Sequence, residues 1–219
     1  MSEISVIPVK LYEKLFIGIS GMIAAGKSTL CKELGRVMNL PVYFEEVINN
    51  EYLADFYKDP KKYAFPLQIH LLNKRFKQQQ LVIWSDKGGI QDRTIYEDSV
   101  FCKMLRDDGS MSDRNYRTYI DLFRNMSNFM RKPNLIIHLD VSPEESLERL
   151  KMRNRKCEDG VPLDYLKRLH VCYEEFISDI AKVIPVIKVN YSKFKTAEEM
   201  AKIIKKEWDQ MSTVVEIDS

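Results

Sequence analysis

Apolar residues follow two alternating patterns along this chain. The first pattern is a short, nearly continuous apolar run, which predicts a buried strand. Such runs occupy residues 15–20, 42–44, 135–139 and 185–189, and residues 89–92 form a weaker strand pattern that ends in Gln91 and Asp92. The second pattern repeats at helical spacing and covers about residues 50–58, 63–84, 95–107, 112–131 and 161–182. Because short buried strands that alternate with helices are typical of a parallel sheet covered on both faces, we predict an α/β fold with a five-stranded parallel sheet flanked by helices.

Two of the predicted helices begin with capping signals. Ser142 is followed by proline and lies three residues before Glu145, which combines an N-cap with a capping box. Thr196 and Glu199 repeat the capping box before the last helical pattern. The chain contains no internal repeat, low-complexity segment or Gly/Ser-rich linker. We therefore expect residues 1–219 to form a single domain.

The composition indicates the cellular compartment of the protein and argues against some classes of partner. Of the 219 residues, 45% are hydrophobic and 30% are charged, and the net charge is only +2. The basic residues form no continuous stripe, which argues against a protein that coats nucleic acid. The four cysteines have no metal-ligand or redox-motif spacing, and no apolar run approaches the ~20 residues of a membrane span. We expect a soluble cytoplasmic protein with no nucleic-acid or membrane partner.

A phosphate-binding motif follows the first predicted strand. Residues 21–28 match the pattern G-x-x-x-x-G-K-[ST], and a helical pattern begins directly after them. In such a loop the backbone N–H groups surround phosphate oxygens, Lys27 reaches the β- and γ-phosphates, and Ser28 binds Mg²⁺. The predicted ATP-binding loop comprises Gly21, Met22, Ile23, Ala24, Ala25, Gly26, Lys27, Ser28 and Thr29. The chain lacks an [NT]KxD motif after the fourth strand, so a kinase is favoured over a GTPase.

A cluster of cations follows the fourth strand. Residues 149–156 contain five cations in eight positions near the end of a predicted helix. Cations favour the carboxyl end of a helix, but that preference explains only one or two of them. A kinase needs such a group because charge on the transferred phosphoryl must be stabilised while water is excluded. We predict a lid at about residues 149–160, in which Arg149 and Arg153 bind ATP and Arg153 and Arg155 act in catalysis.

The order of these motifs resembles the deoxynucleoside kinase family, which includes deoxycytidine, deoxyguanosine and deoxyadenosine kinases. The resemblance runs from about residue 14 to 192 and rests on residues 21–29, 44–47, 56–68, 92–94, the lid and residues 160–166. Residues 108–113 are similar to the bacterial deoxyadenosine/deoxyguanosine branch. The resemblance implies a P-loop kinase fold and ATP-dependent phosphorylation of the 5′-hydroxyl of deoxynucleosides in nucleotide salvage. It also implies Mg²⁺ and a homodimer.

The resemblance assigns catalytic roles at the ends of the second and third strands. Glu45 corresponds to the carboxylate that meets the substrate 5′-hydroxyl, and such a carboxylate can accept the proton which the hydroxyl loses. The family usually has proline at the next position, where this chain has Glu46. Neighbouring strand residues point to opposite faces, so only one carboxylate should enter the site. The resemblance implies that Arg93 holds Glu45 and the 5′-hydroxyl, beside Lys27. It also implies that Asp92 faces Mg²⁺ through water, or itself acts as the base.

Base recognition is expected on the long helix of residues 63–84. Gln68 and Arg75 are seven residues apart, so they share one face of this helix. The resemblance implies that both lie over the nucleobase and that Asp98 pairs with Arg75. It implies that purine deoxynucleosides, deoxycytidine or both are favoured over thymidine, because the pair crowds the side of the pocket that would take the thymine methyl group.

The resemblance also implies contacts to the sugar and to the adenine of ATP. Tyr57 and Glu158 correspond to the pair that binds the 3′-hydroxyl and leaves little room for a ribose 2′-hydroxyl. Tyr191, Ser192 and Lys193, near the end of the fifth strand, are expected to border the ATP adenine.

Two other functions stay open at this point. A nucleoside monophosphate kinase of the thymidylate type would share the P-loop and the lid, but it needs cations for the phosphate of its substrate. A regulatory module that binds nucleotide without catalysis is the second alternative, and the intact Lys27, Ser28 and Asp92 argue against it. An ATPase of another class is excluded less firmly, because the fourth strand ends at Asp140, as a Walker B strand would.

Overall fold

The computed structural model describes residues 14–45, 50–155, 158, 160–191 and 196–211. Its strands are β1 (Leu15–Gly21), β2 (Val42–Tyr43), β3 (Gly88–Asp92), β4 (Leu135–Asp140) and β5 (Val186–Asn190). They form one sheet in the order β2-β3-β1-β4-β5, and every neighbouring pair is parallel. The predicted five-stranded parallel sheet is therefore confirmed, with bounds within a residue or two of the apolar runs.

The helices also follow the predicted pattern. They are α1 (Lys27–Met38), α2 (Leu53–Lys58), α3 (Pro60–Trp84), the short 3₁₀ helix η1 (Ile95–Glu97), α4 (Asp98–Asp107), α5 (Asp113–Asn128), α6 (Pro143–Arg153), α7 (Leu163–Ile180) and α8 (Ala197–Met211). The Ser142 hydroxyl accepts the Glu145 N–H at 3.2 Å. The Thr196 hydroxyl and the Glu199 carboxylate each accept the other residue's N–H, at 3.2 and 3.1 Å. Both predicted capping signals therefore begin real helices.

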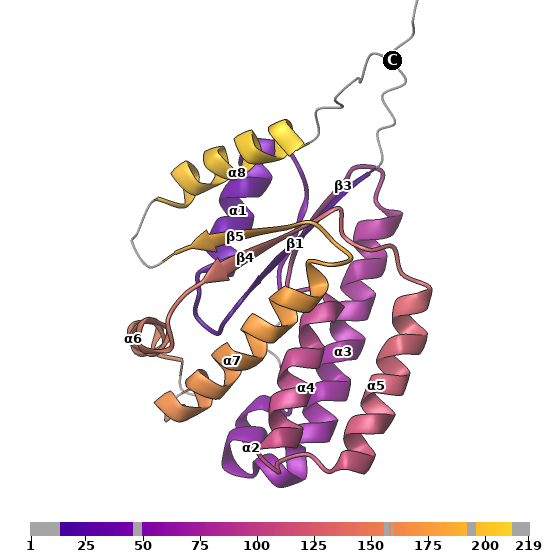
Figure 1. Ribbon diagram of the computed structural model, residues 1–219, viewed down its shortest axis with the longest axis vertical. Helices are drawn as coiled ribbons and strands as arrows, with labels where there is room; N and C mark the ends of the chain where they lie inside the picture. The colour runs from indigo at the N-terminus through magenta and orange to yellow at the C-terminus, as the bar shows by residue number, and fades with distance from the viewer. Residues whose placement is uncertain (1–13, 46–49, 156–157, 159, 192–195, 212–219) are drawn as a thin grey trace, which may run out of the picture.

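The sheet separates two hydrophobic layers. Leu135, Ile137 and Leu139 of β4 pack with α1 and α8 on one face, whereas Ile136 belongs to the layer formed with α3, α4 and α7. Figure 1 shows α8 beside α1 on one side of the sheet, and α3, α4, α5 and α7 grouped on the other. Because both faces of this strand are covered, residues 135–137 are apolar without alternation.

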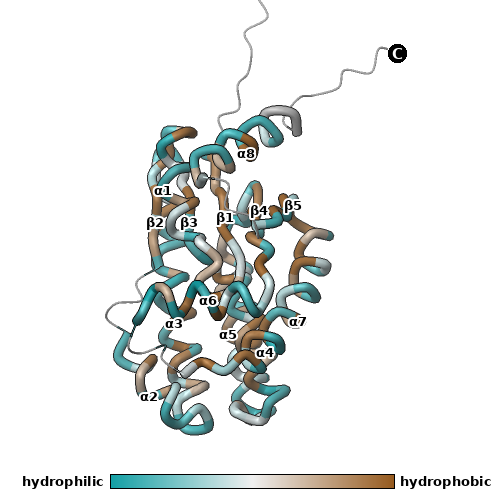
Figure 2. Tube along the Cα trace, turned by 90° about the vertical axis from the view of Figure 1, so that its left-hand side faces the viewer, coloured by the Kyte–Doolittle hydropathy of each residue, from teal (hydrophilic) through white to brown (hydrophobic). Residues whose placement is uncertain are grey.

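Hydropathy along the trace agrees with this layering. In Figure 2 the hydrophobic colours concentrate in the strands, while α6 and the outer turns of α8 are largely hydrophilic. Within the described residues, no helix has the length and apolar character that crossing a bilayer requires.

The carboxyl ends of the central strands bring the predicted site together. β1 ends at the phosphate loop and β3 ends at Asp92, which lies opposite Ile19 in the parallel register. Gly26, at the start of α1, has φ 95°, and a side chain there would also approach the Tyr191 ring to 3.0 Å. The tight turn therefore needs glycine at this position. Open parallel sheets bind their ligands at this end of the strands.

Candidate active site

A cavity of about 380 Å³ opens at this end of the sheet. Its lining contains most of the residues predicted from the sequence: Ile23, Ala24, Ala25, Gly26, Lys27, Ser28, Thr29, Glu45, Tyr57, Gln68, Arg75, Asp92, Arg93, Arg149, Arg153, Arg155 and Glu158. Apolar walls come from Leu53, Leu67 and Phe101. The fold therefore collects residues from segments far apart in the chain, from the phosphate loop to the lid, around one space.

A few predicted residues lie elsewhere. Gly21 and Met22 begin the loop without lining the cavity, and Asp98 is buried behind Arg75. Tyr191 lines an adjoining hollow that also touches Gly26 and Arg149. The remaining predicted adenine neighbours, Ser192 and Lys193, lie outside the described residues, as does Glu46.

Lys27 is held inside the loop that it belongs to. Its Nζ donates to the carbonyl oxygens of Gly21 and Met22 at 3.0 and 2.7 Å. Burial, with Arg93 nearby, lowers the pKa of Lys27 to about 8, although Asp92 and other carboxylates act in the opposite direction. The Lys27 amine is thus fixed at the phosphate loop. An anionic ligand bound there would raise its pKa again.

Helix α6 supports the same loop from the other side. Arg149 donates from Nη1 to the Ala25 carbonyl at 3.0 Å and from Nη2 to the Tyr191 carbonyl at 2.7 Å. The Ser146 hydroxyl donates to the Ile23 carbonyl at 2.6 Å. Arg149 therefore joins the phosphate loop to the end of β5, in addition to lining the cavity.

Ser28 and Asp92 form a pair of hard oxygen donors. The Ser28 hydroxyl donates to Asp92 Oδ2 at 2.5 Å. Burial raises the pKa of Asp92 above its usual value. Among the described residues, the buried Asp92 Oδ1 has no hydrogen-bond partner. A buried carboxylate with one oxygen unused, beside a hydroxyl, suits a small divalent cation such as Mg²⁺.

Glu45 lies between two buried arginines. Arg75 Nη2 contacts Glu45 Oε1, and Arg93 Nε lies 3.2 Å from Glu45 Oε2. Burial alone would raise the pKa of Glu45, but Arg75, Arg93 and Lys27 outweigh burial and hold the pKa at about 2. Arg75 also contacts Asp98, the pair expected from the sequence. Sequence reasoning did not anticipate that Arg75 would reach Glu45 as well.

The lid and the predicted sugar site share one carboxylate. Arg153 Nη2 lies 2.5 Å from Glu158 Oε2, and Arg155 Nη1 lies 3.8 Å from Glu158 Oε1. Glu158 is buried, and it lines the cavity together with Tyr57. Ion pairs therefore join Glu158, which is expected to bind the 3′-hydroxyl, to the two lid arginines that are expected to act on the transferred phosphoryl group.

The predicted base-binding face is present on α3. Gln68 and Arg75 are both buried, and both line the cavity. In the part of the chain that the structure describes, Gln68 Oε1 has no hydrogen-bond partner. An unused buried amide oxygen is an acceptor for an exocyclic amino group, such as those of adenine and cytosine.

Sequence reasoning missed two buried residues behind the cavity. Glu97 and Tyr173 both contact Arg93 Nη1. Glu97 carries a detectable signal, because it follows Arg93 at the i, i+4 spacing of a helical ion pair. Tyr173 lies 80 positions away in the chain, so only the folded structure places it at Arg93.

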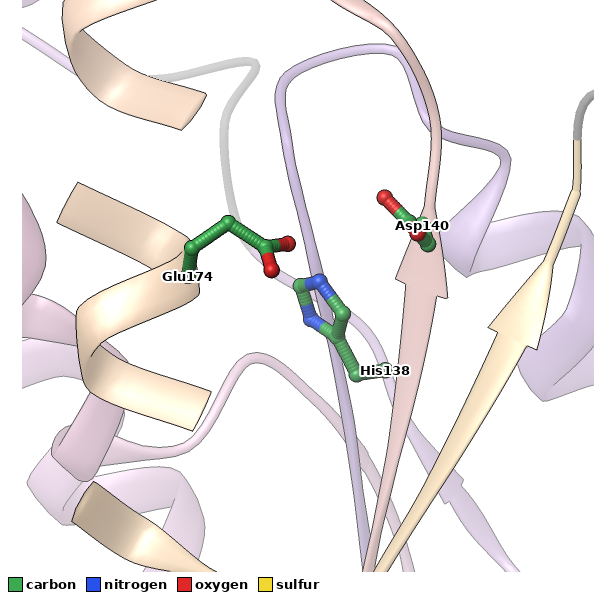
Figure 3. A group of neighbouring side chains, drawn as sticks. All are labelled: His138, Asp140 and Glu174. Atoms are coloured by element: carbon green, nitrogen blue, oxygen red, sulfur yellow. The ribbon is translucent and has the colours of Figure 1, made fainter. Parts of the chain in front are cut away.

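A second group of side chains resembles a metal site, and it lies away from the cavity lining. His138, Asp140 and Glu174 place their ligand atoms within 4.8 Å of one another, and Figure 3 shows Glu174 of α7 pointing toward the His138 ring. Lys188 Nζ lies 2.8 Å from Glu174 and 3.2 Å from Asp140, so an ammonium group already neutralises the carboxylates. We interpret Asp140, Glu174 and Lys188 as an ion-pair network that joins β4, β5 and α7, with the His138 ring beside it.

Comparison with known proteins agrees with the geometry. The model of the deoxynucleoside kinase family matches residues 17–213. The chain is 60% identical to a deoxyadenosine kinase of Dictyostelium discoideum over 209 residues, which are 95% of this chain and 85% of that protein. It is 35% identical to a deoxyadenosine/deoxycytidine kinase of Bacillus subtilis (strain 168), over 91% of this chain and 92% of the relative.

Solved structures give the same result. Deoxyadenosine kinase from M. mycoides with bound dATP superposes with a TM-score of 0.79 at 30% identity, over 89% of this chain and all of the other. The same enzyme with dCMP and dCDP gives a TM-score of 0.80 at 29% identity, over 90% of this chain and all of the other. Its P-loop kinase fold is the fold predicted from the sequence. Because the family model matches residues 17–213 of its 219 residues, this chain belongs to the deoxynucleoside kinase family.

Proposed function

We propose that this enzyme transfers the γ-phosphoryl group of ATP to the 5′-hydroxyl of a deoxynucleoside, with deoxyadenosine as the leading substrate. Family membership makes the chain a phosphotransferase that acts on deoxynucleosides. The observation that carries the proposed residue roles is the position of Glu45. Its carboxylate is held by two arginines in the same cavity as the phosphate loop. An oriented carboxylate and a phosphate cradle are the two groups that this transfer requires.

In the proposed mechanism the Glu45 carboxylate accepts a hydrogen bond from the 5′-hydroxyl and orients the hydroxyl oxygen toward the γ-phosphorus of ATP. A pKa of about 2 makes Glu45 a weak base, so it would receive the proton late, after most of the bond to phosphorus has formed. A loose transition state for phosphoryl transfer tolerates such a late proton transfer. Asp92 has the higher pKa, and in this proposal its contact with Ser28 supports a role in holding the cation instead.

Ser28 and Asp92 would hold Mg²⁺, which neutralises charge on the β- and γ-phosphates when it is bound. The Ser28 hydroxyl and the unused oxygen of the buried Asp92 carboxyl group fit that cation. Lys27, Arg153 and Arg155 would then surround the transferred group from the loop and the lid.

The base preference rests on α3 and on the relatives. Gln68 offers a buried amide oxygen, and Arg75 offers a guanidinium whose position Asp98 fixes. The adenine amino group can donate to the Gln68 oxygen, and the neighbouring adenine ring nitrogen can accept from the Arg75 guanidinium. The relative at 60% identity is a deoxyadenosine kinase. We propose the order deoxyadenosine first, deoxyguanosine and deoxycytidine lower, and thymidine last.

The molecule as a whole is proposed to act as a single-domain, cytoplasmic homodimer. Three described cysteines, Cys31, Cys102 and Cys172, are free and buried, which suits a reducing compartment. The homodimer follows from the family resemblance and is tested by sedimentation equilibrium of the full chain.

Initial rates with the four natural deoxynucleosides and with dAMP test this function. We expect deoxyadenosine to give the highest kcat/KM, and thymidine and dAMP to give the lowest. Phosphorylation of dAMP without phosphorylation of deoxyadenosine would support a monophosphate kinase instead. Absence of turnover with all five acceptors would indicate a nucleotide-binding module. Lys27→Ala is the negative control, because it removes the phosphate-binding amine.

A further inference from the structure

Two consecutive carboxylates lie behind the arginines that hold Glu45. Asp98 contacts Arg75, and the residue before it, Glu97, contacts Arg93. Both are enclosed, since Glu97 is 1% exposed and Asp98 is 0% exposed. The charges therefore alternate in the order Asp98, Arg75, Glu45, Arg93, Glu97. Glu45 is the centre of this chain, and each arginine is anchored from behind by its own carboxylate.

Glu97 gathers donors from three separate elements on a single oxygen. Its Oε1 accepts from Arg93 at the end of β3, from the Tyr173 hydroxyl of α7, and from the Gly21 N–H at 3.4 Å. The Tyr173 hydroxyl also lies 2.5 Å from Arg93 Nη1. Glu97 thus joins the first residue of the phosphate loop to the arginine at the other side of the reacting groups.

Arg93 has a backbone conformation that needs such support. Its φ of 67° lies in the left-handed region, which is uncommon for residues other than glycine. Conformations of this kind persist where surrounding contacts determine them, and they concentrate at functional sites. The guanidinium contacts Glu45 through Nε at one end and Glu97 through Nη1 at the other. Its central carbon lies 5.2 Å from the centre of the Phe101 ring.

We propose that Glu97, together with the Tyr173 hydroxyl, positions Arg93 for phosphoryl transfer without touching the substrate. Among the residues that the structure describes, neither lines the cavity, whereas Arg93 and Glu45 do. A guanidinium held at both ends can move little, so Glu45 and the 5′-hydroxyl would keep their alignment with the phosphoryl group. Without the contact to Glu97, the Arg93 guanidinium could move together with the Glu45 carboxylate and would no longer hold it in one position. This proposal rests on the proposed function, in which Arg93 holds Glu45 and the hydroxyl.

Glu97→Gln is the first test. Glutamine has nearly the same size as glutamate but lacks the charge that anchors Arg93. Because small misplacements of reacting groups slow a reaction strongly, we expect kcat to fall about tenfold to hundredfold. The KM for ATP should stay within about twofold, since Lys27 is unchanged and the glutamine oxygen can still accept the Gly21 N–H of the phosphate loop. The measurement is steady-state kinetics well below the melting temperature, with the folded fraction checked by circular dichroism.

Tyr173→Phe provides a milder variant that is expected to fold, and Tyr119→Phe is its matched control. Each substitution removes one buried hydroxyl from a tyrosine that is at most 1% exposed. Only the Tyr173 hydroxyl contacts Arg93 and Glu97. We expect Tyr173→Phe to lower kcat about threefold to tenfold, and Tyr119→Phe to leave it within about twofold.

A double-mutant cycle separates positioning from general stabilisation. If Glu97 acts through Arg93, then Glu97→Gln should change kcat by less than about twofold when Arg93→Ala is already present. An additive loss in the double mutant would overturn the proposal. So would a lower melting temperature in Glu97→Gln with unchanged kcat, because that result assigns Glu97 to folding alone. If the unmutated enzyme fails to phosphorylate any deoxynucleoside, the proposed function fails first, independently of Glu97.

Discussion

Glu45 is the residue on which the charges of the site converge. Burial opposes its ionisation, yet Arg75, Arg93 and Lys27 together hold its pKa at about 2. It is therefore ionised throughout the neutral range, and its strength as a hydrogen-bond acceptor matters more than its strength as a base. A carboxylate clamped in this way keeps one orientation, which is what alignment of a hydroxyl with phosphorus needs.

Substitution of Glu45 tests this role directly. Glu45→Gln should lower kcat by about 10²-fold or more, because the amide can neither accept the proton nor hold both arginines. Binding of ATP should hardly change, since the phosphate loop is intact. Stopped-time assays of kcat and isothermal titration with an ATP analogue measure the two effects separately.

The neighbouring residue supplies the matched control. Glu46→Gln makes the same chemical change one position later, and the sequence predicts that two adjacent side chains at the end of an extended run point to opposite faces. We expect its kcat to stay within about threefold of the unmutated value. If Glu46→Gln were the more damaging substitution, the assignment of Glu45 would be wrong.

At the scale of elements, the sequence could predict the features that depend only on residues close to one another in the chain. The phosphate loop is contiguous, and the strand runs and capping boxes are short patterns, so all of them are recognisable without the fold. Gln68 and Arg75 share a helix face through simple periodicity. These features account for the five strands, for two helix starts and for the phosphate-loop part of the cavity lining. The family resemblance supplied other lining residues, such as Glu45, Tyr57 and Glu158.

The contacts that could not be predicted join distant elements. Arg75 and Glu45 are 30 positions apart, and Arg93 and Tyr173 are 80 positions apart. A periodic sequence pattern cannot indicate such a contact, because the contact depends on how α3 and α7 pack against the sheet. The family resemblance named Arg75 as a base-reading residue, and the structure adds that the same guanidinium contacts Glu45.

The lid is the element whose cations should act in the transition state. Arg153→Ala and Arg155→Ala should each lower kcat by more than they raise the KM for ATP, because these cations are expected to stabilise charge that builds in the transition state as the bond to the leaving oxygen breaks. Arg153 should show the larger effect, since its contact with Glu158 at 2.5 Å fixes it more firmly than the 3.8 Å contact of Arg155. Steady-state kinetics with varied ATP distinguish the two parameters. An effect confined to KM would mean that these arginines only bind ground-state phosphate.

Helices α3 and α4 together should set the base preference. Thymine carries a methyl group on the side that the Arg75–Asp98 pair crowds, so Arg75→Met with Asp98→Ala should raise the ratio of thymidine to deoxyadenosine kcat/KM. Because Arg75 also contacts Glu45, kcat should fall for every substrate, and the ratio is therefore the informative quantity. Each single substitution should be worse than the double, since it leaves one charge buried without its partner. An unchanged ratio in the double mutant would show that these residues do not read the base.

At the scale of the whole molecule, buried ionisable groups connect the sheet to α7. His138 of β4 is 2% exposed, and its Nδ1 lies 3.2 Å from the Ser20 hydroxyl of β1. Burial lowers the pKa of His138 to about 4, against an opposing influence from Glu97 and Asp140. The folded protein therefore keeps this imidazole neutral at a pH where the unfolded chain protonates it.

This difference predicts acid sensitivity with a defined window. Between pH 6.5 and about 4 the unfolded chain binds a proton that the folded protein excludes, so the free energy of unfolding falls as the pH falls. From pH 7 to 5 the loss should be about 2 kcal/mol. Glu45 acts in the same direction but only below about pH 4.5, and the raised pKa of Asp92 acts in the opposite direction, so the contribution of His138 is the difference between the unmutated protein and a His138 variant. His138→Asn places an amide near the Ser20 hydroxyl and removes the titration, so its urea midpoint should vary much less over this range. Equal pH dependence in both proteins would show that His138 is not responsible.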